Sequence, residues 1–483
     1  MTHNPPGPGN RPPIDDLNAL REGPHAFFLQ VARTYGPIVR YPVGPLAVYL
    51  VTGPDGVKHV LQDNHKNYCK DTFQYNLLST ITGKGLLTSD GDHWRRQRRL
   101  AQPAFQKGRV AGFAPMIVGA TENMLDHWGE HAGRGEAIDV AAEMMHVALQ
   151  VVGKAMFSAE IGDQADELAT ATLTVLDHII GRARTFGVVP EWLPTPGNRA
   201  HRRALGVLDR AVYATIEERR KSLRSLEPAA ARDVHTLEEL AAQDGETRKA
   251  FDDLLALLMA ATDEGTAEAA PGSEVQQRGM TDRQLRDESM TMLIAGHETV
   301  ASALAWTWDL LARNAGAEAR LHEELDGELG GRAPAAEDLP RLRYTDMVFQ
   351  EAMRLYPPAW LITRKALDED EIDGYTIPKG ALVVTSPYVT QRMPDLWPEP
   401  DAFRPERFSP EESAGRHRYA FYPFGGGPRM CIGSGFAAVE AGLIIATVAQ
   451  RYTLRLAAGH PVVVESGVTL RPKHGLKMQL QPR

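Results

Sequence analysis

The most informative stretch of this chain reads Phe424-Gly425-Gly426-Gly427-Pro428-Arg429-Met430-Cys431-Ile432-Gly433. Three successive glycines and a proline exclude a regular helix or strand here, and they leave backbone N–H groups free to point toward one place. A thiolate inside such a turn accepts those N–H bonds, and a helix that begins after Gly433 stabilises its charge further. A thiolate held in this way is a good ligand for iron.

Other interpretations of this stretch compete with an iron ligand. Gly433-Ser434-Gly435 loosely matches a dinucleotide-binding fingerprint, but no clear strand precedes it and no acid follows at the expected position. A redox dithiol needs a second cysteine nearby, and the other cysteine is Cys69. A cysteine protease needs a partnered histidine and a different setting. An inert cysteine in a glycine-rich turn therefore remains as the alternative.

The composition is typical of a soluble globular protein. The chain has 483 residues, of which 43% are apolar and 24% charged, and this excludes a disordered chain, a fibrous repeat and a disulfide-stapled miniprotein. The formal charge of -9 does not favour general binding to nucleic acid or to anionic membranes. Two cysteines and the lack of an apolar segment in residues 1–13 predict a protein of the reducing cytoplasm. The most apolar stretch, residues 302–312, is short and interrupted by Asp309, so we expect no membrane-spanning helix.

The order of patterns along the chain predicts its organisation. We expect a flexible tail over residues 1–16 and a single domain over residues 17–483. Apolar pairs within residues 36–61, on either side of a turn at Gly44-Pro45, predict a β-hairpin. Helical periodicity then dominates from about Asp90 onward.

The helical region is interrupted twice and ends near Tyr356. Polar residues over 225–247 and 263–280 predict two loops. After residue 359 the chain is richer in Pro, Gly and β-branched residues, and residues 382–384 and 462–464 predict short strands. The predicted fold class is therefore mainly α with a smaller β region, of the α+β type.

The longest predicted helix begins at a capping box. Thr281 supplies the capping hydroxyl and Gln284 supplies an amide three residues later. The periodic pattern runs to about Arg313, where Asn314 stops it. At 1.5 Å per residue such a helix is about 50 Å long, which is enough to cross a whole domain.

The middle of this helix reads Ala295-Gly296-His297-Glu298-Thr299. Glycine there costs about 1 kcal/mol relative to alanine, so it indicates either a flat group close to the backbone or tight helix packing. A zinc helix is excluded because position 301 is Ala instead of a second His. Glu298 and Thr299 offer an acid and a hydroxyl that can deliver protons, although such a buried pair is more often structural.

A third pattern lies on a helix predicted over residues 345–356, which Pro357-Pro358 ends. Glu351 and Arg354 are three residues apart, so they share one face of that helix. An exposed pair of this kind contributes only ~0.2–0.5 kcal/mol. A buried pair needs further partners, and Arg407 is a candidate member of such a cluster.

Together these motifs resemble the haem-thiolate monooxygenases of the cytochrome P-450 superfamily, over nearly the whole chain. The positions that match its Phe-x-x-Gly-x-Arg-x-Cys-x-Gly signature are Phe424, Gly427, Arg429, Cys431 and Gly433. Residues 295–299 resemble its oxygen-activation helix. Its Glu-x-x-Arg network is matched by Glu351 and Arg354, with Arg407 as the third member. Its Trp-x-x-x-Arg motif is matched by Trp94 and Arg98. The resemblance implies a P-450 fold, in which a long central helix lies over a haem and the Cys loop lies on the proximal side.

The resemblance also implies haem b as the cofactor and a role for each residue around it. Cys431 would be the proximal iron ligand, Phe424 would tune the thiolate, and Gly433 would let the ring lie close to the backbone. The residues implied to bind the two propionates are Trp94, Arg98, Arg364 and Arg429.

On the oxygen side the resemblance implies proton delivery. Thr299 would hydrogen-bond the bound dioxygen, Glu298 would relay protons, and Ala295 and Gly296 would leave room for oxygen. Many family members have Thr or Ser after this threonine, whereas this chain has Val300, which would alter local hydration without removing the hydroxyl.

The implied reaction inserts one atom of O2 into a lipophilic small molecule, by hydroxylation or epoxidation. The resemblance is to soluble bacterial-type members without a membrane anchor, and we expect a monomer. Because no flavin or iron–sulfur extension follows Arg483, electrons derived from NAD(P)H would come through a separate ferredoxin or flavodoxin with its reductase. Four arginines within residues 95–99 would dock such a partner or form a solvated basic face. No nucleic-acid partner is expected.

Two functions other than an O2-dependent monooxygenase are compatible with a haem-binding cysteine. A peroxide-driven peroxygenase or isomerase of the same fold would need no external electrons, but such relatives often lack the acid–threonine pair that Glu298 and Thr299 form here. A non-catalytic haem sensor is less favoured, because no appended DNA-binding or signalling module is visible in the sequence.

The resemblance places the substrate pocket around residues 73–81, 172–189 and 359–362 and the middle of the long helix. The candidate lining residues are Phe73, Leu77, Leu78, Ile81, Leu293, Trp360, Leu361 and Ile362. These apolar side chains indicate a lipophilic substrate of secondary metabolism, such as a terpenoid, fatty acid or polyketide. Each of them is also typical of ordinary core.

Overall fold

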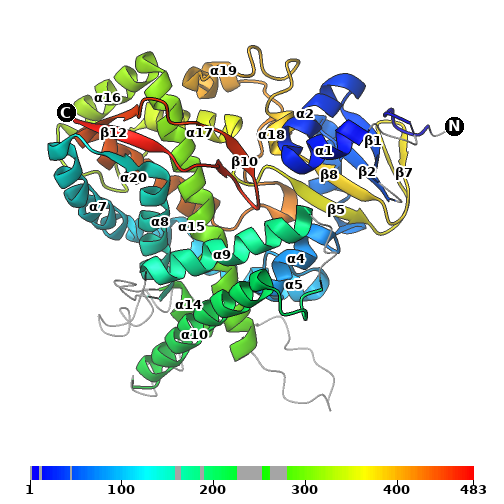
Figure 1. Ribbon diagram of the computed structural model, residues 1–483, viewed down its shortest axis with the longest axis horizontal. Coiled ribbons are helices and arrows are strands. Elements are labelled where there is room, and N and C mark those ends of the chain that lie inside the picture. Colours follow the sequence, from blue (N-terminus) through cyan, green and yellow to red (C-terminus); the bar gives the residue numbers. More distant parts are fainter. Residues whose placement is uncertain are drawn as a thin grey trace. The chain divides into compact units, whose positions relative to one another are not determined.

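Figure 1 shows the computed structural model of the chain, which describes residues 3–9, 14–43, 46–157, 165–184, 190–225, 253–260 and 280–483. The chain forms two units. The first comprises Met1–Gln74, Ile117–Met144 and Thr299–Arg483, and the second comprises Tyr75–Met116 and Met145–Glu298. Helix α15 (Asp282–Arg313) contributes to both, because the boundary falls within it.

The main sheet of the first unit has five strands in the order β1-β2-β8-β5-β3. They are β1 (Ile38–Val43), β2 (Leu46–Val51), β8 (Leu382–Thr385), β5 (Ile362–Ala366) and β3 (Tyr68–Cys69). β1 and β2 pair antiparallel with Ile38 opposite Val51, and β8 runs parallel to β2. The strand predicted at residues 382–384 is therefore confirmed, and so are the hairpin strands over residues 38–43 and 46–51. The hairpin prediction is wrong for residues 54–61, which are helical. The turn Gly44-Pro45 lies outside the described residues.

Three smaller sheets complete the strands of this unit. They are formed by β4 (Ala137–Asp139), β12 (Lys477–Pro482) and β9 (Tyr452–Leu456); by β6 (Asp370–Ile372) and β7 (Tyr375–Ile377); and by β10 (Val464–Ser466) and β11 (Leu470–Pro472). The strand predicted at residues 462–464 begins only at Val464, where pairing with Pro472 starts.

The structure gives the predicted N-terminal tail two fixed points. The Arg40 backbone N–H donates to the Pro6 carbonyl at 2.9 Å, and the Thr376 N–H donates to the His3 carbonyl at 3.2 Å. Helix α1 (Ile14–Glu22) begins inside the segment over which the tail was expected.

Besides α1 and α15, the helices that contribute to the first unit include α2 (Pro24–Tyr35), α3 (Pro54–Lys58), α7 (Ala114–Arg134), α8 (Val140–Phe157), α16 (Ala315–Leu329), α17 (Arg343–Leu355), α18 (Pro387–Thr390), α19 (Pro410–Ser413) and α20 (Ser434–Arg451). The short helical turns of this unit are η1 (His59–Asp63), η2 (His65–Asn67), η6 (Pro405–Phe408), η7 (Arg418–Ala420) and η8 (Gly427–Arg429).

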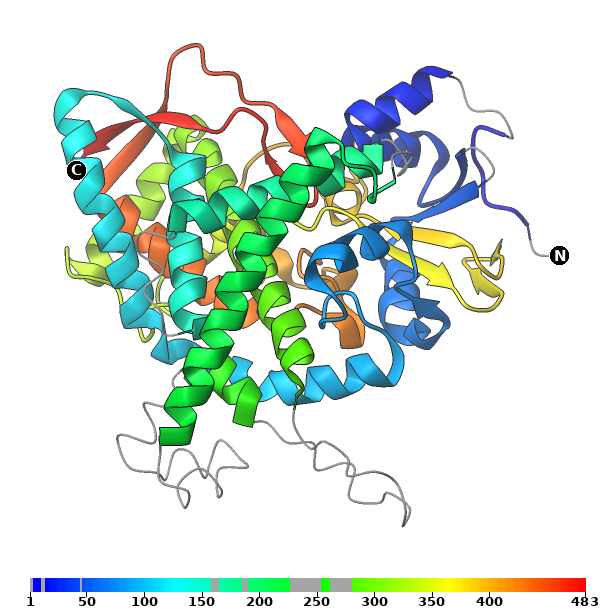
Figure 2. The same ribbon diagram turned by 60° about the horizontal axis from the view of Figure 1, so that its bottom comes forward.

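The described part of the second unit is helical. Besides segments of α7, α8 and α15 it contains α4 (Phe73–Thr82), α5 (Gly91–Ala101), η3 (Gln102–Phe105), α6 (Lys107–Gly112), α9 (Ala165–Arg184), α10 (Pro196–Ser225) and α14 (Leu254–Ala260). Helices α9 and α10 lie side by side (Figures 1 and 2). α10 buries Ala204, Leu208, Val212 and Ile216, which recur every four residues and so form one face.

The predicted class, mainly helical with small sheets, is confirmed by these elements. The two loops predicted over residues 225–247 and 263–280 fall almost entirely outside the described residues. None of the described helices is long and apolar enough to span a bilayer.

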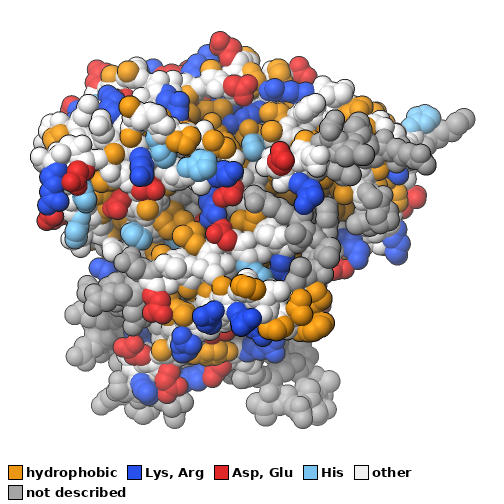
Figure 3. All heavy atoms as spheres, viewed as in Figure 1, with side chains coloured by type: hydrophobic (Ala, Val, Ile, Leu, Met, Phe, Trp, Pro, Cys, Tyr) orange, Lys and Arg blue, Asp and Glu red, His pale blue; other side chains and the backbone are white. Residues whose placement is uncertain are grey.

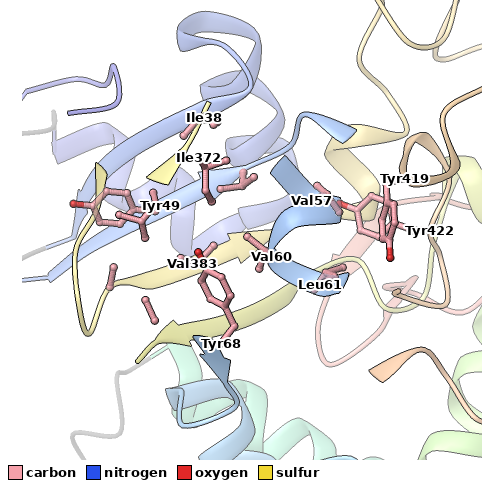
Figure 4. Close-up of a cluster of buried hydrophobic side chains, with 14 residues drawn as sticks. Ile38, Tyr49, Val57, Val60, Leu61, Tyr68, Ile372, Val383, Tyr419 and Tyr422 are labelled. Atoms are coloured by element: carbon pink, nitrogen blue, oxygen red, sulfur yellow. The ribbon is translucent and has the colours of Figure 1, made fainter. Parts of the chain in front are cut away.

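One hydrophobic cluster of the first unit supports the Cys431 loop, and Figure 4 shows it. It joins the main sheet to α3, η1 and η7. The labelled side chains are Ile38, Tyr49, Val57, Val60, Leu61, Tyr68, Ile372, Val383, Tyr419 and Tyr422. Since Leu61, Tyr419 and Tyr422 adjoin the glycine-rich loop, its path is fixed by core packing.

Candidate active site

Helix α15 begins as its sequence predicts. The Thr281 N–H donates to the side-chain oxygen of Gln284 at 2.8 Å, and the Gln284 N–H donates to the Thr281 hydroxyl at 3.2 Å. This reciprocal pair satisfies backbone donors at the helix start. The helix ends at Arg313, also as predicted, and it carries Glu298 and Thr299 at consecutive positions.

The middle of α15 has one face that neighbouring side chains do not fully cover. From Asp287 to Leu311 every residue is buried except Ala295, Gly296 and Thr299, which are half-buried. Residues three and four positions apart lie on the same face of a helix, so these three form a single strip. Small side chains on this strip let a ligand approach the backbone and the Thr299 hydroxyl.

Gly296 also has a packing role. A Cβ atom at this position would lie 2.8 Å from Cγ2 of Val152 on α8. The sequence left helix packing and a flat neighbour as alternatives for this glycine. Packing against Val152 on α8 is by itself a sufficient reason for a glycine at position 296. The half-buried strip is also compatible with a flat ligand close to the backbone.

The Cys431 loop is irregular, as its glycines predict. Gly425 and Gly427 have φ of 71° and 62°, a conformation that residues with a Cβ rarely adopt. The Cys431 N–H donates to the Phe424 carbonyl at 3.0 Å, which closes the loop and means that this N–H does not face the thiol. The Cys431 side chain is exposed and precedes the first residue of α20, Ser434, by three positions. The positive end of that helix favours a thiolate.

Two glycines allow the loop to sit against the cluster of Figure 4. A Cβ on Gly427 would lie 2.0 Å from the Leu61 carbonyl oxygen, and one on Gly426 would lie 2.3 Å from the Tyr419 ring. The Tyr419 hydroxyl donates to the side-chain oxygen of Gln62 at 3.0 Å. These contacts of Gly426, Gly427 and Tyr419 place the loop without using the thiol.

The cationic residues predicted to bind propionates occur in both units. In the first unit Arg364 is buried on β5, where its guanidinium donates to a backbone carbonyl at 2.8 Å, and Arg429 is half-buried in η8. In the second unit α5 carries Trp94, which is buried, and Arg98, which is half-buried. Residues four apart share a helix face, so α5 presents Trp94 and Arg98 together.

Glu351, Arg354 and Arg407 form a buried ionic network. Arg354 donates to both carboxylate oxygens of Glu351, at 2.7 and 2.8 Å, and Nε of Arg407 lies 3.3 Å from the same carboxylate. None of the three is more than 2% exposed. Arg354 donates further to the carbonyls of Gln391, Pro400 and Ala402. The alternative of a solvated pair is wrong, because the network ties α17 to residues 391–407.

The predicted pocket residues have different surroundings. Of the residues on α4 and α15, Leu77, Leu78, Ile81 and Leu293 are buried, whereas Phe73 is 46% exposed. Leu361 and Ile362 are half-buried. Trp360 packs in a core cluster with Phe27 and Tyr41, and its indole N–H donates to the Gly467 carbonyl at 3.1 Å. Core packing therefore accounts for Trp360, and the predicted lining segment at 185–189 lies outside the described residues.

Two acids of α15 that the sequence analysis did not single out hold the loop between α4 and α5. The Lys84 N–H donates to Asp287 at 2.9 Å and the Leu86 N–H donates to Glu288 at 3.0 Å. Glu288 is fully buried, and its second carboxylate oxygen has no hydrogen-bond partner among the described residues. Burial, and secondarily the Asp287 charge, raises the pKa of Glu288 to about 7, although the Leu86 hydrogen bond opposes the shift.

Glu288→Gln is expected to change how the free energy of unfolding depends on pH. In the unfolded chain the pKa of this carboxyl is near its ordinary value of 4.5, but in the folded chain its pKa is about 7. Between these values the folded state holds the extra proton, so stability falls as pH rises through this window, by about 3 kcal/mol in all. The glutamine variant should be as stable as the wild type near pH 4.5. Above pH 7 its free energy of unfolding should exceed that of the wild type by about 3 kcal/mol.

Urea unfolding of both proteins across this pH range measures the effect. Glu323→Gln, at an exposed position of α16, is the matched control and should show no such trend. A constant difference between Glu288→Gln and wild type at all pH values would mean that Glu288 is ionised in the folded protein, contrary to the expectation.

The residues around Cys431 fit a haem. The exposed thiol of Cys431 lies just before the start of α20, and a thiolate in such a position is a suitable ligand for haem iron. Buried Arg364 and half-buried Arg429, in the same unit, suit the two carboxylates of a haem. The half-buried strip of α15 adds a hydroxyl, from Thr299, that a ligand can reach.

Comparison with known proteins supports this interpretation. The profile of the family described as Cytochrome P450 matches residues 5–478. Cyclooctatin synthase of Streptomyces melanosporofaciens is 36% identical over 456 residues, covering 94% of this chain and 89% of that protein. Pentalenene oxygenase of Streptomyces avermitilis is 30% identical over 448 residues, covering 92% and 88%. The crystal structure of the cytochrome P450DA heme domain, at 24% identity, covers 100% of this chain and 98% of its own, with a TM-score of 0.83, and so confirms the fold.

The profile match spans almost the entire chain, and the alignment with cyclooctatin synthase covers 89% of that protein. The glycine-rich cysteine loop, the buried Glu351 network and the long helix lie where the sequence predicted them. This chain belongs to the cytochrome P450 family and is a P450 monooxygenase.

Proposed function

We propose that the chain binds haem b through Cys431 and oxygenates a terpenoid. Held by Cys431, a haem would supply the chemistry of O2 activation, in which two electrons and two protons are consumed, one oxygen atom enters the substrate and the other leaves as water. The cytoplasmic protein receives its electrons from a separate ferredoxin or flavodoxin. The observation that carries the proposal is the strip of Ala295, Gly296 and Thr299, where an otherwise buried helix is only half-covered and carries a hydroxyl.

The residues of this chain have separate tasks in that reaction. Thr299 would supply a hydroxyl that holds a proton near the reacting oxygen, and Glu298, 2% exposed and next to it in α15, would supply protons. Arg364 and Arg429 pair with the propionates, and Trp94 and Arg98 on α5 are further candidates for that role. The buried apolar side chains of α4 and α15 exclude water from the reacting carbon.

The terpenoid assignment rests on relatives together with the apolar candidate pocket. Cyclooctatin synthase and pentalenene oxygenase carry terpenoid names, and Cyclooctat-9-en-7-ol 5-monooxygenase of Streptomyces melanosporofaciens, at 32% identity, is a third such relative. A ligand screen by Soret shift tests the assignment directly. Polycyclic terpenes should shift the band at low concentration, whereas a shift with fatty acids alone would reject terpenoids as the substrate class.

Thr299→Ala is expected to uncouple oxygen consumption from product formation. Loss of the hydroxyl removes the hydrogen bond that directs protons to oxygen, and a positioned proton donor contributes about 100-fold or more. Product per O2 consumed should fall severalfold while substrate binding is unchanged. The measurement compares oxygen uptake, peroxide release and product in a system reconstituted with ferredoxin and reductase.

Val300→Ala, at the adjacent buried position, is the control and should stay coupled. Coupling in Thr299→Ala equal to that of the wild type would refute the proton-delivery role. Turnover with peroxide alone at the rate of the reconstituted system would replace the O2-dependent proposal with a peroxygenase.

A further inference from the structure

Two histidines stack against each other where α9 meets the start of α10. The ring centroids of His178 on α9 and His201 on α10 are 4.3 Å apart, and the ring planes differ by only 21°. His201 is 7% exposed and shares the buried face of α10 with Ala204 and Leu208. His178 is half-buried. The pair is therefore part of the contact between two helices that lie side by side in Figures 1 and 2.

The ring nitrogens of this pair are poorly satisfied. Nε2 of His178 and Nδ1 of His201 are buried and have no hydrogen-bond partner among the described residues. Burying an unpartnered polar atom costs free energy, whereas phenylalanine would fill a similar volume without that cost. A shared metal ion does not explain the pair either, because the nitrogen lone pairs of nearly parallel rings lie in separate planes and do not converge. Neither packing nor metal binding therefore accounts for histidine at both positions.

The start of α10 favours the neutral form of these rings. A Cβ atom on Gly197 would lie 3.9 Å from Nδ1 of His178, so this ring faces the first turn of α10. The helix begins after Thr195, whose hydroxyl accepts from the Asn198 N–H at 3.1 Å. The positive end of the helix dipole therefore lies beside the imidazole and opposes its protonation.

Charged side chains from the surrounding elements have the same effect. The cations that act on the pair are Arg182 on α9 and Arg202 on α10, and the acid is Glu191 in the turn before α10. Glu191 lies 3.5 Å from Nε of Arg182, so its charge is shared with that cation. In Figure 3 Lys and Arg side chains gather over α10, where Arg199, Arg202 and Arg203 are exposed. The surroundings of the pair are therefore mainly cationic.

Burial and these charges lower the pKa of both histidines. The pKa of His201 falls to about 4, first through burial and then through the charge of His178, while Glu191 opposes the shift. The pKa of His178 is lowered by burial and by Arg182. Two imidazolium rings 4.3 Å apart would also repel each other, so the stacked arrangement disfavours a second proton.

We infer that this pair is a pH-sensitive contact, in which protonation of the two rings separates the start of α10 from α9. When the helices part, each imidazole reaches water and takes up a proton at its ordinary affinity. Below pH 6.5, the ordinary pKa of histidine, the separated state therefore binds more protons than the closed state, and its population rises as pH falls. Because α9 carries residues 172–184 of the predicted pocket, acid conditions should also weaken binding of a lipophilic ligand. Only this last consequence rests on the proposed function.

The size of the effect follows from the number of protons taken up. One extra proton raises the separated population about tenfold per pH unit, and two raise it about a hundredfold. For His201 the window runs from pH 6.5 down to about 4, so this residue alone contributes up to about 300-fold. Since His178 contributes as well, the population should rise by more than about tenfold per pH unit near pH 5.

Hydrogen exchange of the haem-loaded protein without substrate tests the inference. Mass spectrometry follows the backbone amides of residues 196–208 at several values from about pH 7 to pH 5, and each rate is divided by that of an unstructured peptide at the same pH. Protection of this segment should fall by more than about tenfold per pH unit at the acid end of the range. Helix α20, in the first unit, is the internal reference for global unfolding and should stay protected.

Substitutions that remove the titrating rings define the cause. His178→Phe and His201→Phe each remove one proton site, so the remaining dependence should be no steeper than about tenfold per pH unit. The double variant should show no dependence. His25→Phe is the matched control, because burial and Arg392 lower the pKa of His25 to about 4 as well, but this residue lies in the first unit. In that control α10 should respond to pH as in the wild type.

Two results would overturn the inference. One is wild-type protection of residues 196–208 that does not change with pH, and the other is an unchanged pH dependence in the double variant. If a phenylalanine variant loses the wild-type Soret spectrum, His178→Asn combined with His201→Asn makes the same comparison, because asparagine does not titrate. Since exchange is measured without substrate or turnover, this inference and the proposed function fail independently.

Discussion

Cys431→Ser is expected to abolish oxygenation while leaving the chain folded. A serine hydroxyl is not ionised at neutral pH and donates far less charge to iron than a thiolate does, so activation of oxygen fails. Substitution of residues that only hydrogen-bond to a metal's ligands already lowers activity by about 10–100-fold. Loss of the ligand itself should therefore lower turnover by more than about 100-fold. Turnover in the reconstituted system, normalised to haem content, measures the effect.

Cys69→Ser is the matched control for this prediction. Cys69 lies in β3, where it is half-buried and has Lys365 opposite it in the ladder. The Cys431 loop is positioned by Gly426, Gly427 and their contacts, none of which involves the thiol. The Cys431 variant should therefore unfold at the same urea concentration as the Cys69 variant. Full activity in Cys431→Ser would show that the iron ligand lies elsewhere.

Glu351→Ala is expected to destabilise the fold by about 3–5 kcal/mol. The substitution leaves the guanidinium groups of Arg354 and Arg407 buried without their shared carboxylate. It also removes the acceptor of the Arg404 backbone N–H, which donates to Glu351 at 2.9 Å. A native protein has only about 5–15 kcal/mol of stability, so the variant should lose a large fraction of it.

Urea unfolding followed by circular dichroism measures this loss. Lys379→Gln is the control, because its pair with Asp368 is exposed on both sides and such pairs contribute about 0–1 kcal/mol. If Glu351→Ala shifted the unfolding midpoint no more than Lys379→Gln does, the network would be dispensable for the fold. Glu351→Gln, which keeps the volume and one acceptor, should fall between the two.

Local sequence was sufficient for the features that depend on neighbours along the chain. The capping box of Thr281 and Gln284 and the stop at Asn314 located α15 correctly, because both act within four residues. The irregular path of the Cys431 loop followed equally from its glycines, two of which need a positive φ. Such features can be predicted wherever the chemistry is local.

Long-range features were predicted only in part. The sequence suggested that Arg407 joins Glu351 and Arg354, but the bonds of Arg354 to the carbonyls of Gln391 and Ala402 depend on the folded chain. The contact of Glu288 with Leu86 joins positions 202 apart, so no local pattern identifies Leu86 as the partner. The sequence does show two adjacent acids, Asp287 and Glu288, in a helix predicted to be buried, and such a pair indicates that partners exist. Trp360, expected to line a pocket, is held by core packing that involves residues more than 300 positions away.

The absorption spectrum of the reduced wild-type protein under carbon monoxide tests the central claim most directly. Binding of haem iron by the Cys431 thiolate predicts the strongly red-shifted Soret band of a thiolate-ligated ferrous carbonyl, and its loss in Cys431→Ser. A band at the position of a nitrogen-ligated haem, or a purified protein that retains no porphyrin, would contradict it.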